Sequence, residues 1–85
     1  MTTWMRLLDA AMRKHGETFD DIESSTFTAK QLHAKFDAAS GKVSGNQFTC
    51  WTYARVYFPW QYDGAEGVAS VARYPDGKPT EHIGG

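Results

Sequence analysis

The stretch FTCWTYARVYFPWQY, residues 48–62, decides the fold of this 85-residue chain. It contains seven of the twelve aromatic residues of the sequence. Because β-branched and aromatic side chains suit a pleated, half-buried surface, the stretch predicts two antiparallel strands, near residues 47–52 and 55–60. Asp63-Gly64 then gives a hairpin signal, and a third strand is predicted over residues 68–73.

A first helix is predicted upstream of these strands, over residues 3–15. Apolar residues recur there at spacings of three and four, which is typical of an amphipathic helix. Thr2 or Thr3 can cap its start. His15 stands in a basic last turn that complements the helix dipole, and Gly16 can adopt the left-handed conformation that ends a helix.

A second helix is predicted over residues 29–40. Thr28 and Gln31 have the spacing of a capping box at its start. Ser40-Gly41 is expected to end it, with Gly41 in the left-handed conformation.

These elements predict an α+β fold in a single domain over residues 1–85. Two N-terminal helices pack on a three-stranded antiparallel meander, and an extended tail follows over residues 74–85. The sequence has no run of 18 apolar residues and no signal-peptide pattern, so no membrane contact and a cytoplasmic location in a bacterial host cell are expected. The lone Cys50 agrees, because one cysteine cannot form an internal disulfide.

The length of the loop at Tyr53-Ala54 determines which strand residues share a face. A two-residue loop gives two groups: Trp51 with Val56 and Phe58, and Phe48 with Cys50 and Tyr57. A three-residue loop gives two different groups: Phe48, Cys50, Val56, Phe58 and Trp60, and Trp51 with Tyr57. In both cases apolar side chains occupy both faces, and two short helices cover only one. The tail, a second copy in a homodimer, or a partner protein would cover the other.

Motifs for catalysis or cofactor binding are missing from the sequence. The histidines, His15, His33 and His82, lie in separate segments without ligand spacing, so no metal or other cofactor is expected. Cys50 lies in the middle of a predicted strand, where a lone cysteine is usually a small core residue. The eight glycines form no phosphate-binding motif. No enzymatic activity is therefore expected, although a small enzyme subunit is a further alternative.

Charge is segregated along the chain. The net charge of −1 disfavours direct nucleic-acid binding, which usually requires a basic domain. Residues 17–23 nevertheless carry four acids and no base: Glu17, Asp20, Asp21 and Glu23. This run is either a solvated face or a docking patch for a basic partner surface.

Protein binding is the function that the aromatic content favours. Trp, Tyr and Arg supply most of the energy of protein interfaces, and so small a domain cannot bury all of its aromatic rings. Besides the four acids, the candidate partner-binding residues are Trp51, Tyr53, Arg55, Tyr57, Trp60 and Tyr62. Two alternatives remain: a large aromatic core with a few exposed rings, or a single-stranded nucleic-acid-binding module that stacks bases on the sheet.

Four motifs stand in the C-terminal part of the chain. They are W-T-x-x-R-V-Y-F-P at Trp51–Pro59, Y-D-G at Tyr62–Gly64, S-V-x-R-x-P at Ser70–Pro75 and T-x-H-x-G-G at Thr80–Gly85. This pattern resembles small uncharacterised accessory proteins of phages and prophages. An aromatic residue is common in them where this chain has Gly67, a departure expected to reduce strand packing.

The resemblance implies a phage accessory protein. Small phage proteins of this size often bind and block a host factor, and anti-CRISPR proteins are the best-known class. The expected function is therefore that of a non-enzymatic inhibitor of a host defence protein, such as a CRISPR-Cas effector.

Overall fold

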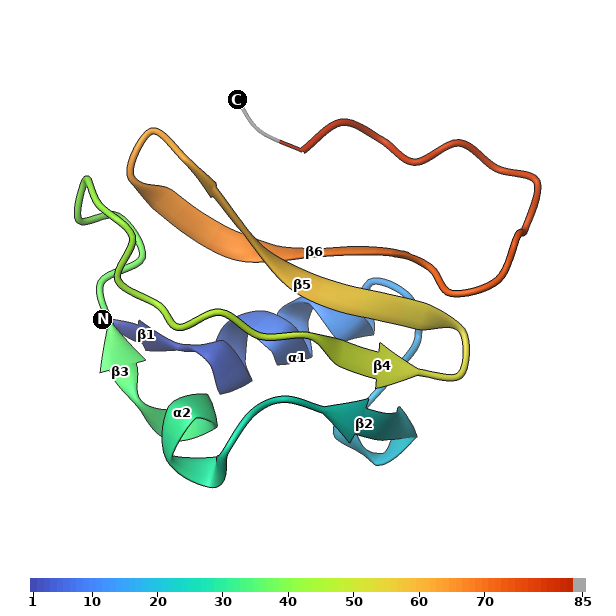
Figure 1. Ribbon diagram of the computed structural model, residues 1–85, viewed down its shortest axis with the longest axis horizontal. Coiled ribbons are helices and arrows are strands. Elements are labelled where there is room, and N and C mark those ends of the chain that lie inside the picture. The colour runs from blue at the N-terminus through green and yellow to red at the C-terminus, as the bar shows by residue number, and fades with distance from the viewer. Residues whose placement is uncertain (84–85) are drawn as a thin grey trace.

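A four-stranded antiparallel sheet, backed by one helix, forms the framework of the computed structural model, which describes residues 1–83 (Figure 1). The strand order is β2 (Ile22–Ser25), β4 (Cys50–Thr52), β5 (Arg55–Tyr62) and β6 (Ala65–Ala72). The α+β class is confirmed. The predicted three-stranded meander is incomplete, because β4, β5 and β6 are joined by β2 at one edge.

Strand β2 lies in the acidic linker, where no strand was predicted. Its sequence, IESS, contains a single apolar residue. A bulge between Ile22 and Ser24 shifts the register, so that Ile22 pairs with Thr52 and Ser24 pairs with Trp51. The extra residue disrupts the alternation of side chains that identifies a strand in a sequence.

Helix α1 (Trp4–Arg13) covers one face of the sheet, and it lies behind the sheet in Figure 1. Thr3 caps it, as predicted, by accepting a hydrogen bond from the backbone N–H of Arg6 at 3.1 Å. Gly16 (φ +70°) ends it with the predicted left-handed turn. Three residues at helical spacing are fully buried on its inner side: Trp4, Leu8 and Met12.

Helix α2 is shorter than predicted. Its capping box at Thr28 forms, but the helix spans only Ala29–His33 rather than 29–40. The next residues form β3 (Lys35–Phe36), which pairs with β1 (Thr2–Thr3) in a separate two-stranded sheet. The ring of Phe36 packs 4.7 Å from that of Trp4, so tertiary packing overrides the helical periodicity of the sequence.

Gly41 has a positive φ of 88°, as predicted, but it lies in a turn after β3 rather than at a helix end. The predicted hairpin at Asp63-Gly64 is confirmed, with φ angles of 49° and 83°. Strands β5 and β6 extend to this turn, beyond their predicted ends at residues 60 and 68. Strand β4 is shorter than the predicted 47–52, because pairing begins only at Cys50.

The β4–β5 loop has two residues, which resolves the register. Cys50 pairs with Tyr57, and Trp51 pairs with Val56. The sheet face that carries Cys50 and Tyr57 packs on α1. The core comprises Trp4, Leu8, Met12, Phe36, Phe48, Cys50 and Tyr57.

The tail forms no helix or strand over residues 73–83, in agreement with the predicted extended tail. It turns back along the outer side of β6 (Figure 1). Gly84 and Gly85, which end the last sequence motif, lie outside the described residues. No helix in residues 1–83 has the length and apolar content needed to cross a lipid bilayer.

Candidate functional site

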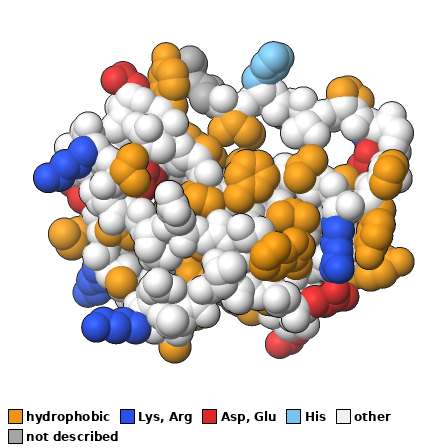
Figure 2. Space-filling view, in the orientation of Figure 1, with side chains coloured by type: hydrophobic (Ala, Val, Ile, Leu, Met, Phe, Trp, Pro, Cys, Tyr) orange, Lys and Arg blue, Asp and Glu red, His pale blue; other side chains and the backbone are white. Residues whose placement is uncertain are grey.

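The sheet face opposite α1 carries a cluster of aromatic side chains, which we call the aromatic face. It comprises Trp51, Phe58, Trp60 and Tyr62, placed together by the register of β4 and β5. None of these four belongs to the core cluster. Tyr62 is 53% exposed, and the other three are partly exposed. Figure 2 shows hydrophobic side chains gathered over the middle of the molecule in this view.

Gly67 gives the indole of Trp60 its place on the aromatic face. The two residues are directly paired across β5 and β6. A Cβ atom at Gly67 would lie 2.6 Å from three indole atoms of Trp60, so the ring lies against the β6 backbone. The glycine therefore makes room for the indole, and the expectation that it weakens packing here is wrong.

Tyr57 and Glu17 are turned inward, away from the aromatic face. Tyr57 is fully buried, and its hydroxyl donates a hydrogen bond to Oε1 of Glu17. Burial, followed by this bond, raises the pKa of the Tyr57 phenol. Tyr57 was predicted to bind a partner, but a fully buried side chain is not available for contact. The two-residue loop explains this outcome, because it places Tyr57 on the core face.

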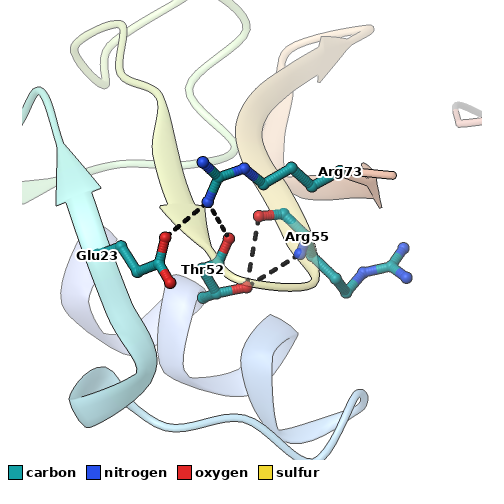
Figure 3. Close-up of polar contacts among 4 residues, drawn as sticks. All are labelled: Glu23, Thr52, Arg55 and Arg73. Atoms are coloured by element: carbon teal, nitrogen blue, oxygen red, sulfur yellow. Dashed lines mark hydrogen bonds and ion pairs between the residues drawn. The ribbon is translucent and has the colours of Figure 1, made fainter. Parts of the chain in front are cut away.

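Glu23 belongs to a polar network that joins three strands (Figure 3). Its carboxylate accepts a hydrogen bond from Nη1 of Arg73 at 2.7 Å. The same Nη1 donates to the carbonyl oxygen of Thr52 at 3.1 Å. The hydrogen bond to Glu23 raises the pKa of Arg73. Arg73, just after β6, thus links β2 to β4, a role that the sequence did not indicate.

Asp20 and Asp21 are the other two acids of the run, and both are exposed, as Glu23 is. They lie in a short 3₁₀ helix, η1 (Phe19–Asp21), directly before β2. The carboxylate of Asp21 also accepts a hydrogen bond from the backbone N–H of Thr18 at 2.8 Å. Since β2 pairs with the strand that carries Trp51, both acids lie at that edge of the sheet.

Tyr53 lies apart from the aromatic face, in the β4–β5 loop. It is 71% exposed, and its ring centroid is 5.6 Å from that of Tyr74. The guanidinium of Arg73 is 5.5 Å from the Tyr74 ring. The two tyrosines therefore form a small separate cluster at the hairpin end.

A groove of about 550 Å³ lies on the other side of the sheet, between α1, β6 and the tail. Arg55 points toward it and donates from Nε to Oγ of Ser70 at 2.8 Å. Oγ of Ser70 is in turn 3.4 Å from Nε2 of His15. Burial and then the charge of Arg55 lower the pKa of His15, which disfavours the cationic form that its place at the helix end suggested.

The Ser70–His15 pair has poor geometry for nucleophilic catalysis. Its 3.4 Å separation exceeds the roughly 2.6–3.2 Å expected of a nucleophile and its base. No described carboxylate forms a hydrogen bond to His15. Arg55 also lowers the basicity of the imidazole. The groove is thus better suited to binding an anion through Arg55 than to activating Ser70.

Cys50 is an inert core residue, as its position suggested. It is fully buried, and burial raises the pKa of its thiol to about 11 from an ordinary value of 9.0. We expect iodoacetamide at pH 8 to alkylate the native protein at least about 100-fold more slowly than the urea-unfolded protein, because the thiolate is the nucleophile. Equal rates by mass spectrometry would contradict this placement.

The same shift makes stability depend on pH. The pKa of the Cys50 thiol is higher in the folded than in the unfolded protein. The thiol therefore makes its full contribution to the free energy of unfolding below about pH 9, and this contribution is lost as the pH rises through about 11.

Metal ligands do not cluster in the described part of the chain: residues 1–83 contain no group of three or more His, Cys, Asp or Glu side chains placed to share an ion. The aromatic face and the groove are therefore the surfaces with distinctive chemistry. Comparison with known proteins finds no matching family model, no matching curated protein and no matching solved structure.

Proposed function

We propose that this chain is a non-enzymatic protein-binding module, and that the aromatic face is its anchor. Because the sequence resembles phage accessory proteins, the proposed partner is a host defence protein, such as a CRISPR-Cas effector. The module would block the surface of this partner.

The observation that carries the proposal is the position of four aromatic rings outside the core, on the sheet face opposite α1. Tryptophan and tyrosine are the side chains most often found at the energetic centre of interfaces. Their rings add large contact area at low entropic cost, since few rotatable bonds must be fixed. Trp60 is already held against Gly67, so little ordering is needed when a partner binds.

Negative charge at one edge of the aromatic face favours a basic partner surface. Asp20 and Asp21 are exposed at the β2 edge, next to the strand that carries Trp51. Glu23 is adjacent, but its carboxylate forms an ion pair with Arg73. Carboxylates at the rim of an interface mainly raise the association rate with a basic surface. A partner with a basic groove, such as a nucleic-acid channel, fits this arrangement.

Single substitutions on the aromatic face test the proposal. We expect Trp60→Ser or Trp51→Ser to weaken binding to the effector by about 30-fold each, the effect of removing a central anchor. The measurement is binding of the purified module to purified CRISPR-Cas effectors by calorimetry, together with plaque counts of a targeted phage in immune cells that express each variant.

Val43→Ser is the matched control, because Val43 is 62% exposed in a loop outside the sheet. It should bind and inhibit like the wild type. Circular dichroism should show that all variants are folded. Wild-type activity of the double Trp51/Trp60 variant would overturn the role of the aromatic face, and failure to bind any effector would overturn the choice of partner.

Nucleic-acid binding is the rival function for the same surface, because bases can stack on aromatic side chains of a sheet. The residues of β5 and β6 that share this face include no cation. Gel shifts with single strands at two salt concentrations discriminate the two functions. Tight binding that falls with salt would favour nucleic acid and contradict the proposal.

A further inference from the structure

Strand β6 has a free outer edge. It is the last strand of the sheet, and it pairs with β5 over its full length. The backbone N–H of Glu66 points away from β5, since it donates to the carbonyl oxygen of Ala38 at 2.7 Å. By alternation, the N–H groups of Val68, Ser70 and Ala72 also point outward. No described residue accepts a hydrogen bond from any of these three.

The groove runs beside this edge. Val68, Ser70 and Ala72 line it, with α1 on one side and the tail on the other. An open row of donors and acceptors is a template for one more strand, unless a protein covers it. The opening between β6 and the tail therefore combines an unpaired strand edge with about 550 Å³ of space.

Cations outnumber carboxylates by three to two in the lining of the groove. Lys14, Arg55 and Lys78 line it, and within residues 1–83 none of them forms an ion pair. Two carboxylates also line it: Glu81, and Asp76, which accepts a hydrogen bond from the backbone N–H of Lys78 at 2.9 Å. Arg55 is fixed through Nε by Ser70, which leaves its two terminal nitrogens to bind a carboxylate.

We propose that this groove binds an extended acidic peptide segment of a partner protein, which adds to β6 as a fifth strand. The main chain of the peptide pairs with Val68, Ser70 and Ala72, and one of its carboxylates binds the guanidinium of Arg55. Strand addition supplies affinity through main-chain hydrogen bonds, and the side-chain contacts supply specificity. This site is separate from the aromatic face and does not depend on its function.

Two other occupants, a second copy of β6 and the chain's own tail, fit this edge less well. A second copy of β6 would bring only Glu66 as an acid, and Glu66 is buried within its own chain. The tail itself is a poor strand, because Pro79 has no N–H to donate. A separate acidic segment is the occupant that satisfies both the strand edge and Arg55.

The probe is a synthetic seven-residue peptide with glutamates alternating with valines and threonines, titrated into the ¹⁵N-labelled full chain. We expect the amide signals of Val68, Ser70 and Ala72 to shift, and their hydrogen exchange to slow by about tenfold near saturation. Arg55→Gln should weaken binding by about tenfold or more, as the loss of a charge-assisted hydrogen bond predicts.

Two controls accompany the titration. Arg6→Gln removes an exposed cation on α1 outside the groove and should leave the affinity unchanged. A peptide with lysine in place of glutamate should bind at least about tenfold more weakly. The proposal is overturned if the acidic peptide does not bind, if its shifts lie on the aromatic face, or if the three amides are already protected in the free protein. That last result would mean that the tail or a second copy covers the edge.

Discussion

Replacing Glu66 with alanine is expected to lower the free energy of unfolding by about 3–5 kcal/mol, the sum of two hydrogen bonds to a charged acceptor. Glu66 as a whole residue is only 7% exposed. Its two carboxylate oxygens accept hydrogen bonds from the backbone N–H groups of Ser44 at 2.8 Å and Gly45 at 3.0 Å. Alanine would leave both backbone donors without their carboxylate partner.

The two side-chain bonds hold the loop before β4, and residue 66 also holds this loop through its backbone, a bond that the alanine variant keeps. Its backbone N–H donates to the carbonyl oxygen of Ala38 at 2.7 Å. One residue of β6 thus holds the loop at both Ala38 and Ser44-Gly45. For a domain of this size, whose total stability is on the order of 4–13 kcal/mol, losing the two side-chain bonds removes a large share of it.

Urea denaturation followed by circular dichroism measures the effect. Glu66→Gln has nearly the same shape and retains one acceptor oxygen, so it should lose about half as much as the alanine variant. Glu81→Gln, at an exposed position in the tail, should leave stability unchanged within about 0.5 kcal/mol. A Glu66→Ala protein as stable as the wild type would show that the loop is held by other contacts.

The sequence predicted those parts of the fold whose signals are local. Thr3, Gly16 and the Thr28 capping box act through neighbours a few residues away, and each is confirmed. The Asp63-Gly64 turn likewise needs only its own backbone. The error at residues 34–40 has a different origin, since Phe36 reaches the core through the pairing of β3 with β1 rather than on a helix.

The candidate site was predictable by residue type but not by position. The excess of aromatic residues indicated an exposed cluster, and Trp51, Trp60 and Tyr62 lie in it. Tyr57 was misplaced because the β4–β5 loop has no glycine, and turn chemistry could not decide its length.

The groove was missed altogether. His15, Arg55 and Ser70 come from a helix end and two strands, and only the tertiary structure brings them together. Sequence spacing carries no sign of such a site, because each residue taken alone looks like an ordinary surface residue.

The contact between Gly45 and Trp4 carries the second large prediction. A Cβ atom at Gly45 would lie 2.5 Å from Cζ2 and 2.8 Å from Cε2 of the Trp4 indole. Trp4 is fully buried, with Phe36 and Phe48 packed against it, so the ring cannot move aside. We expect Gly45→Ala to destabilise the protein by about 2–3 kcal/mol, as overpacking of a core does.

Gly77→Ala separates steric overlap from backbone strain. Gly77 has a positive φ of 75° but no atom near its missing Cβ, so its variant should cost only about 1 kcal/mol. If Gly45→Ala costs no more than this control, the loop can shift and the contact with Trp4 is not rigid.

A double-mutant cycle with Trp4→Phe assigns the clash to the indole. Phenylalanine lacks the indole atoms nearest Gly45, and it also removes Nε1, which is buried without a hydrogen-bond partner among the described residues. Gly45→Ala should therefore cost about 1–2 kcal/mol less in the Trp4→Phe background than in the wild type. Additive losses, measured by urea denaturation, would place the strain elsewhere in the loop. Coupling would show that the loop backbone at Gly45 lies directly against the Trp4 indole, so that this loop forms part of the wall of the core.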